Sequence, residues 1–166
     1  MSGQEFNLIC DNINSGIFIL NKDLKVKYWN KWLEIQTKIK SKDILDKQIT
    51  EFYKNINEKV LKRKVKTALR LKSSTFYNTE QTKYLFDIKL NKIADSIFYN
   101  MQQSVTISPF NLDEELVIVY IYDTTLQSEI NYKLQKSKEE LEKRNIKLEE
   151  KNNEFERMIN ALTEGL

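Results

Sequence analysis

An unbroken run of seven apolar or aromatic residues, Leu116 to Tyr122, constrains the fold of this chain more than any other stretch. Valine, isoleucine and tyrosine favour pleated strands, and both alternating sets of side chains in this run are apolar. We therefore expect a central strand with both faces covered. The run ends at Asp123-Thr124-Thr125, and a long charged helical pattern follows at once. Such a junction can pass a change in the sheet to whatever the helix reaches.

The junction also carries a helix-start signal. Thr124 is followed three residues later by Gln127, which is the spacing of a capping box. In that motif each of the two side chains satisfies a free backbone N–H group near the helix start. We expect the helix to begin here and to be capped by this pair.

From Leu126 to about Thr163 there is no proline or glycine, which predicts one long helix. Apolar residues recur at every seventh position, which we assign as d: Leu134, Leu141, Leu148, Phe155 and Leu162. The a positions are mostly polar: Asn131, Lys138, Asn145, Asn152 and Ile159. Leucine at d with asparagine at a is typical of a weak parallel two-stranded coiled coil, because polar a residues fix the register at the expense of stability. The alternative is a single amphipathic helix lying on its own domain.

Residues from about Glu5 to Asn14 predict a short amphipathic helix. Four side chains form its apolar stripe: Phe6, Ile9, Cys10 and Ile13. We interpret Cys10 as a small buried hydrophobe rather than a reactive thiol.

Ile17–Leu20 and Leu24–Trp29 flank the turn Asn21-Lys22-Asp23, and this arrangement predicts a hairpin. In the second strand two lysines alternate with Val26 and Tyr28, which predicts one exposed face and one buried face.

Several short helices are expected next. One holds Trp32 and Leu33, and another begins near Ser41 and holds Ile44 and Leu45. The apolar spacing continues at Ile49, Phe52 and Ile56. Val60–Lys72 is a clearer helix with an apolar face and a basic face, the latter made by Lys59, Lys62, Arg63, Lys66 and Arg70. A basic face can attract nucleic acid. We favour a solvated face, because no nucleic-acid motif surrounds it.

The second half of the domain predicts strands. Tyr84–Leu90 and Ser104–Pro109 alternate as strands do, and the loop Asn111–Glu114 leads from the latter into the central strand. Ile93–Met101 fits a loop, an insertion or a helical turn. The order of elements predicts an α+β domain with a five-stranded antiparallel sheet and short helices on one face, followed by the long C-terminal helix.

The amino-acid composition excludes several classes of functional site. The 166 residues include no histidine, which excludes histidine-based triads, HExxH zinc sites, a phospho-accepting histidine and the commonest haem ligand. With three glycines there is no phosphate-binding loop, and no set of residues indicates an enzyme. The single cysteine fits a reducing compartment. No apolar run reaches the roughly 20 residues of a membrane span, so we expect a cytoplasmic domain.

Four stretches together resemble one known family. Ser15–Leu20 enters the first strand, and Tyr28-Trp29-Asn30 closes the second with the aromatic, apolar residue and asparagine that the family often has. Asp43–Lys47 matches a stretch that usually reads Leu-Gly-Lys, with an aspartate in place of the glycine. Asp123-Thr124-Thr125 looks like the Asp-x-Thr motif that ends the last strand. From about Glu5 to Thr125 the sequence therefore resembles a PAS domain, the sensory module of bacterial signalling proteins.

This resemblance implies a PAS fold with a small-molecule cavity between the sheet and the short helices, and an N-terminal helix on the other face. Candidates to line the cavity are Ile19, Tyr28, Trp32, Leu33, Phe52, Leu69, Ile88, Ile107 and Tyr120. It also implies a homodimer, with candidate contacts at Phe6, Ile9, Ile13, Leu134, Leu141, Asn145, Leu148, Asn152 and Phe155. Signal transmission would fall to Asp123, Thr124 and Thr125.

The resemblance also bears on cofactors. Light-sensing flavin members need a cysteine in a helix ahead of the third strand, and Cys10 lies elsewhere. Haem members usually supply a histidine. We therefore expect neither a covalent flavin adduct nor a His-ligated haem, we expect no metal site, and the ligand stays unknown.

We predict a non-catalytic PAS sensory and dimerisation module of a bacterial signal-transduction protein, of the histidine kinase (two-component) or diguanylate cyclase type. Its parts are an N-terminal helix (1–14), a PAS core (15–125) and a coiled-coil helix (126–166) leading to a missing effector domain. Phe155–Leu166 aligns without gaps on Phe6–Ile17, as the start of a second such domain would. The alternatives are a structural spacer with no ligand and nucleic-acid binding through the basic 59–72 helix.

Overall fold

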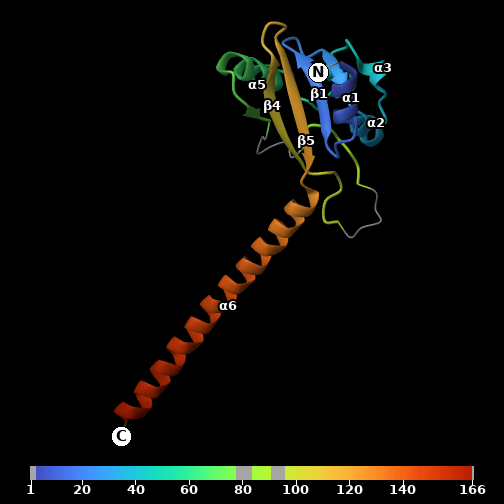
Figure 1. The fold of residues 1–166 in the computed structure, drawn as a ribbon. Coiled ribbons are helices and arrows are strands. Elements are labelled where there is room, and N and C mark those ends of the chain that lie inside the picture. Colours follow the sequence, from blue (N-terminus) through green and yellow to red (C-terminus); the bar gives the residue numbers. More distant parts are fainter. Residues whose placement is uncertain (1–2, 78–83, 91–95, 166) are drawn as a thin grey trace. The chain divides into compact units, whose positions relative to one another are not determined.

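A computed structural model describes residues 3–77, 84–90 and 96–165 (Figure 1). The strands form one antiparallel five-stranded sheet in the order β2-β1-β5-β4-β3. Their bounds are β1 (Gly16–Asn21), β2 (Val26–Trp29), β3 (Thr75–Phe76), β4 (Gln103–Asn111) and β5 (Leu116–Asp123). The chain divides into two compact units, Met1–Leu126 and Gln127–Leu166.

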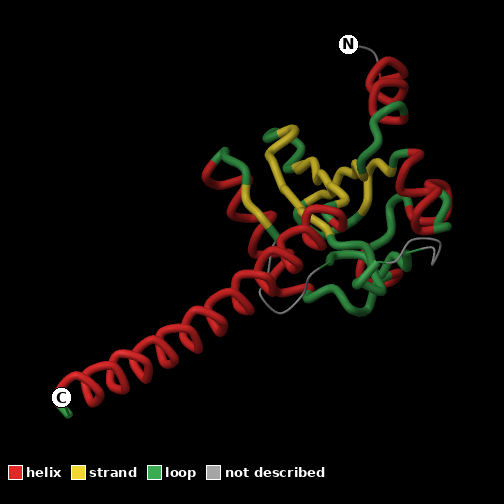
Figure 2. The backbone as a smooth tube through the Cα atoms, turned by 90° about the horizontal axis from the view of Figure 1, so that it is seen from below, coloured by secondary structure: helices red, strands yellow, loops and turns green. Residues whose placement is uncertain are grey.

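Strand β5 lies in the centre of the sheet and is covered on both faces, as its sequence predicts. Val117, Val119 and Ile121 join the large core, in which the helices α2 to α5 pack. Their bounds are α2 (Lys31–Thr37), α3 (Ser41–Ile44), α4 (Ile49–Phe52) and α5 (Glu58–Leu71). On the other face Ile118 packs with Cys10 of α1 (Gly3–Asp11) in a second cluster. Figure 2 shows the helices in red and the strands in yellow.

The long C-terminal helix is confirmed as α6 (Thr125–Glu164), 40 residues or about 60 Å of helix. Its predicted d residues are exposed on the helix surface, with Leu134 at 67% and Leu148 at 58%. No helix in the described ranges is long and apolar enough to cross a membrane.

The strand predicted at Tyr84–Leu90 is wrong. The described part of the chain there makes only an isolated bridge, between Lys89 and Asn100, and the edge strand is the two-residue β3. The physical reason is that Leu85 and Phe86, which are neighbours in sequence, both enter the same core cluster, whereas a strand turns neighbours to opposite faces. Residues 91–95, part of the stretch left open as loop, insertion or helical turn, lie outside the described residues.

The hairpin is confirmed, and Lys25 and Lys27 are exposed as predicted, but Val26 and Tyr28 do not share one face. A register shift between Ile19 and Leu20 sets Leu20 opposite Val26 and Ile19 opposite Tyr28. Val26 therefore points into the large core, and Tyr28 points to the opposite face. A bulge of this kind changes the face on which later residues lie, so simple alternation misplaces Tyr28.

Asn30 explains why the second strand ends where it does. Its buried side chain accepts from the N–H groups of Ile17 (3.1 Å) and Leu33 (3.2 Å), and it caps α2. Its amide donates to the carbonyls of Cys10 and Ser15, both at 2.9 Å. The Asn30 side chain thus makes four hydrogen bonds, and these connect the end of α1, the start of β1 and the start of α2.

Gly16 stands at this meeting point, and its conformation has no positive φ. A Cβ there would lie 2.9 Å from Leu33 Cδ2, 3.0 Å from Trp32 Cζ3 and 3.1 Å from Ile121 Cβ. The position therefore needs glycine for space.

We predict that Gly16→Ala destabilises the protein by about 1–3 kcal/mol, because the added methyl overpacks the core. Urea denaturation would measure the change. Gly3→Ala is the matched control, since a Cβ at Gly3 meets nothing within 4 Å. Equal stability of the two variants would contradict this account.

Glu34 joins α2 to α3. Its Oε1 accepts from the Ser41 N–H at 2.7 Å, and its Oε2 pairs with Lys31 (3.1 Å) and Lys40 (3.8 Å). The Ser41 hydrogen bond, helped by Lys31, lowers the pKa of Glu34 to about 2.

A carboxylate whose folded pKa is lowered stabilises the fold above its unfolded pKa and loses that contribution as the pH falls toward the folded value. We predict that Glu34→Gln costs about 1 kcal/mol at pH 7, because the amide keeps an oxygen acceptor for the Ser41 N–H but loses the negative charge. The deficit relative to the wild type should shrink between about pH 4.5 and pH 2. Thermal denaturation across this range tests it, with the exposed Glu51→Gln as control; a deficit independent of pH would refute it.

Candidate functional site

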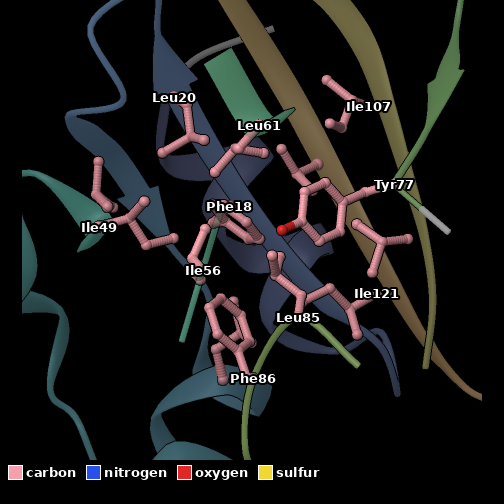
Figure 3. Close-up of a cluster of buried hydrophobic side chains, with 14 of the residues drawn as sticks. Phe18, Leu20, Ile49, Ile56, Leu61, Tyr77, Leu85, Phe86, Ile107 and Ile121 are labelled. Atoms are coloured by element: carbon pink, nitrogen blue, oxygen red, sulfur yellow. The ribbon is translucent and has the colours of Figure 1, made fainter. Parts of the chain in front are cut away.

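The large core contains a group of aromatic rings in mutual contact. Figure 3 shows buried side chains of this core, with Phe18 and Phe86 labelled. The Phe86 ring lies 4.4 Å from that of Tyr53, 5.5 Å from Trp29 and 5.6 Å from Phe18, measured between centroids. Phe18 belongs to β1 and Trp29 to β2, whereas Phe86 comes from the irregular segment and Tyr53 follows α4. This is where the PAS resemblance implies a ligand cavity.

Six of the predicted cavity residues lie in or against this core. Trp32, Leu33, Ile88 and Ile107 are buried in it, and Phe52 and Leu69 pack against it from α4 and α5. The other three, Ile19, Tyr28 and Tyr120, lie on the opposite face of the sheet with α1. They therefore do not face the space between the sheet and helices α2–α5.

The Tyr53 hydroxyl is a polar group enclosed in this apolar surrounding. It is buried and has no hydrogen-bond partner among the described residues. Burial raises the pKa of Tyr53 to about 12, with a smaller opposite effect from nearby Thr37. The Thr37 hydroxyl is itself bonded to the Leu33 carbonyl and the Ile39 N–H. Tyr53 is thus available to bond a polar group that enters the core.

Gln103, the first residue of β4, holds Phe86 in place. Its buried Oε1 accepts from the N–H groups of Leu85 (3.0 Å) and Phe86 (3.1 Å), and its Nε2 donates to the Phe86 carbonyl at 2.8 Å. These three bonds replace the strand ladder that the segment lacks. The predicted site residues do not include Gln103, since its partners lie 17 or 18 positions earlier in the chain.

The neighbouring residue, Gln102, is bonded to the start of α6. Its backbone N–H donates to Thr125 Oγ1 at 2.9 Å, and its carbonyl accepts from the Thr124 N–H at 2.8 Å. Asp123 Oδ1 accepts from the Thr125 N–H at 2.9 Å. The three predicted transmission residues are thus brought together, and Gln102 joins them.

The predicted capping box is wrong. Gln127 donates forward to Asn131 Oδ1 at 3.0 Å, so its side chain does not return toward the helix start. The carboxylate of Asp123 satisfies the first free N–H instead, as an aspartate in an Asx turn does.

A second surface lies on the outer face of the sheet. Phe6 of α1 contacts Tyr28 and Phe110, at 5.3 and 5.5 Å between ring centroids, beside an open groove of about 730 Å³. Cys10 is buried there, as predicted, and burial raises the pKa of its thiol. Ile9 and Ile13 remain exposed.

The basic face of α5 is present as predicted. Five cationic side chains and Thr67 line an open groove of about 540 Å³: Lys59, Lys62, Arg63, Lys66 and Arg70.

Comparison with known proteins decides the family. A model described as the PAS fold matches residues 4–93, which is more than half of the 166 residues. The chain belongs to the PAS family. Members of this family are generally sensory and non-catalytic. A search of the curated proteins found no match.

Solved structures share the PAS fold with this chain. A sensory box sensor histidine kinase from Vibrio cholerae is 24% identical, with a TM-score of 0.51 over 72% of this chain and 90% of that one. An RNA-binding light-oxygen-voltage receptor is 12% identical, with a TM-score of 0.55 over 86% of this chain and 38% of that one. The PAS domain of nitrogen regulation protein NR(II) from Vibrio parahaemolyticus is 17% identical, with a TM-score of 0.49 over 74% and 99%.

We predict that Gln103→Leu destabilises this PAS domain by about 3 kcal/mol or more, because it leaves the buried polar groups of Leu85 and Phe86 without partners. Denaturant unfolding measures the loss. Gln102→Leu is the matched control, since within the described ranges the Gln102 side chain makes one hydrogen bond, to the Asn100 carbonyl, and the backbone bonds of Gln102 remain. A loss no larger in Gln103→Leu than in Gln102→Leu would contradict the assigned role.

Proposed function

We propose that this chain is a non-catalytic sensory and dimerisation module of a bacterial signal-transduction protein, of the histidine kinase or diguanylate cyclase type, working in the cytoplasm. One observation carries the proposal: hydrogen bonds of Gln103 and Gln102 join the aromatic core to the start of α6. Because domains with a PAS fold are generally sensory, we interpret this hydrogen-bonded route as the path by which a signal leaves the core.

The mechanism starts in the core. A molecule that displaces the Phe86 ring also moves the backbone bonded to Gln103. Gln103 and Gln102 are adjacent, so a shift of β4 reaches Thr124 and Thr125 directly. The capping and aim of α6 then change, and the helix carries the change to an effector domain.

The sensed molecule is small and mainly apolar, with one polar group. Trp32, Leu33, Phe52, Leu69, Ile88 and Ile107 supply apolar walls, and the Tyr53 hydroxyl supplies a hydrogen bond. Sites of this kind combine many apolar contacts with few polar ones. Ile19, Tyr28 and Tyr120 belong instead to the surface under α1.

The dimer uses the exposed apolar side chains of two helices. Ile9 of α1 is 52% exposed, and Ile13, which follows that helix, is 41% exposed. Phe6 of α1 packs against the cluster around Cys10. On α6 the contacts are Leu134, Leu141, Asn145, Leu148, Asn152 and Phe155, in a parallel coiled coil.

Native mass spectrometry of the purified, undialysed protein tests this function. We expect a dimer that carries extra mass, and a smaller bound fraction in Tyr53→Phe, which removes only the hydroxyl. A bare dimer in both would favour the alternative, a structural PAS spacer without ligand. A bare monomer would contradict the proposed coiled coil.

The junction gives a separate prediction. Asp123→Ala removes the acceptor for the Thr125 N–H, so we expect it to uncouple sensing from output in the full-length protein while leaving dimerisation largely intact. Asp123→Asn keeps an oxygen acceptor and should retain most of the coupling. The signalling output of each variant is measured with and without the stimulus. Unchanged signalling in Asp123→Ala would count against the mechanism.

Nucleic-acid binding through α5 is a second candidate, favoured by the basic groove alone. It predicts retention on nucleic acid that weakens steeply with salt. Reversing the charges of Lys62, Arg63 and Lys66 should abolish that retention. Salt-insensitive or absent retention in the wild type would remove this candidate.

A further inference from the structure

Helix α5 carries an unbroken series of positive charges. Every charged residue from Lys59 to Lys72 is a lysine or an arginine, although the whole chain has a net charge of only +3. The steps of three and four residues between the cations of the open groove place them on one face of the helix, over roughly 16 Å. We call this set the basic row: Lys59, Lys62, Arg63, Lys66 and Arg70.

The basic row has no anionic partner within the described ranges of the chain. The salt bridges found there all involve other elements, and four of the five cations of the row are exposed. The opposite face of α5 is fixed in the core by its three buried residues, so the row faces away from the core at the margin of the domain (Figure 1). Like charges at these spacings repel one another, and an anionic surface that binds the row relieves that repulsion.

The chemistry of the groove favours a lipid surface over nucleic acid. Besides the cations, its described lining consists of Thr67. This lining offers no aromatic ring on which a base could stack and no amide to bond a base edge. The first turn of α5, the part of a helix that commonly meets bases or phosphates, carries the acidic Glu58. A straight row of cations along the length of a helix matches the plane of anionic lipid headgroups instead.

We propose that the basic row of α5 docks this domain on the surface of an anionic lipid bilayer. The contact is electrostatic, because the apolar face of α5 lies in the core and is not available to insert between lipids. Each lysine or arginine close to an anionic bilayer strengthens binding about fivefold, so the five cations act together. The docking does not depend on the proposed sensing: it determines where the domain is held rather than what the core binds.

Co-sedimentation of the full chain with lipid vesicles tests the docking. Vesicles made of equal parts phosphatidylcholine and phosphatidylglycerol are compared with vesicles of phosphatidylcholine alone. We expect the chain to bind the mixed vesicles at low salt, to be released as salt screens the charges, and not to bind the neutral vesicles. Absence of binding to the mixed vesicles, or equal binding to both kinds, would overturn the proposal.

A pair of charge-neutralising variants tests whether the basic row makes the contact. Arg63→Gln with Lys66→Gln should weaken binding to the mixed vesicles about 25-fold, because two charges of the row are lost. Lys25→Gln with Lys42→Gln is the matched control, since these exposed lysines lie outside α5 and their loss changes the net charge equally. We expect the control to retain most of the binding. An equal loss in the two double variants would overturn the assignment to α5.

Competition with a short duplex DNA separates the two kinds of anionic partner. We expect the mixed vesicles to retain the chain when the duplex is added at the same concentration of phosphate groups. A chain that binds the duplex and not the vesicles would overturn the docking and favour the second candidate function. Neither result changes the mass that native mass spectrometry measures for the proposed function, so the two proposals fail separately.

Discussion

One buried carboxamide, that of Gln103, makes the core of this domain possible. Leu85 and Phe86 enter the core side by side, so neither can belong to a strand ladder, and their backbone groups need other partners. Gln103 supplies three hydrogen bonds to them from the first position of β4. These bonds hold the backbone that carries Phe86 into the aromatic cluster.

This arrangement connects the aromatic core to the start of α6 through hydrogen bonds. The Gln103 side chain faces the core, and the backbone of the preceding residue faces Thr124 and Thr125. Because proteins are close-packed, a displaced ring moves the groups bonded to it. Asn30 fixes the other side of the domain in the same way, since its four hydrogen bonds hold α1, β1 and α2 together.

The elements that could be predicted from sequence are those with local signals. Composition and hydrophobic periodicity predict three of these elements: the apolar strand β5, the amphipathic helix α5 and the uninterrupted helix α6. Simple alternation misplaces Tyr28 because a bulge changes its face. It also assigns residues 84–90 to a strand, although the Gln103 side chain takes the place of a strand ladder there. Gln103 could not be recognised, since a glutamine at a strand start carries no sign of partners far away in sequence.

In the proposed mechanism, a movement of the Phe86 ring is coupled to a movement of the start of α6. Amide hydrogen exchange of Gln102 and Thr124 tests this coupling most directly. These two N–H groups make the bonds that join β4 to the helix start. The account predicts that Phe86→Leu speeds their exchange more than Leu61→Ala, a core variant from α5, once both are corrected for global stability. Equal exchange in the two variants would contradict the coupling.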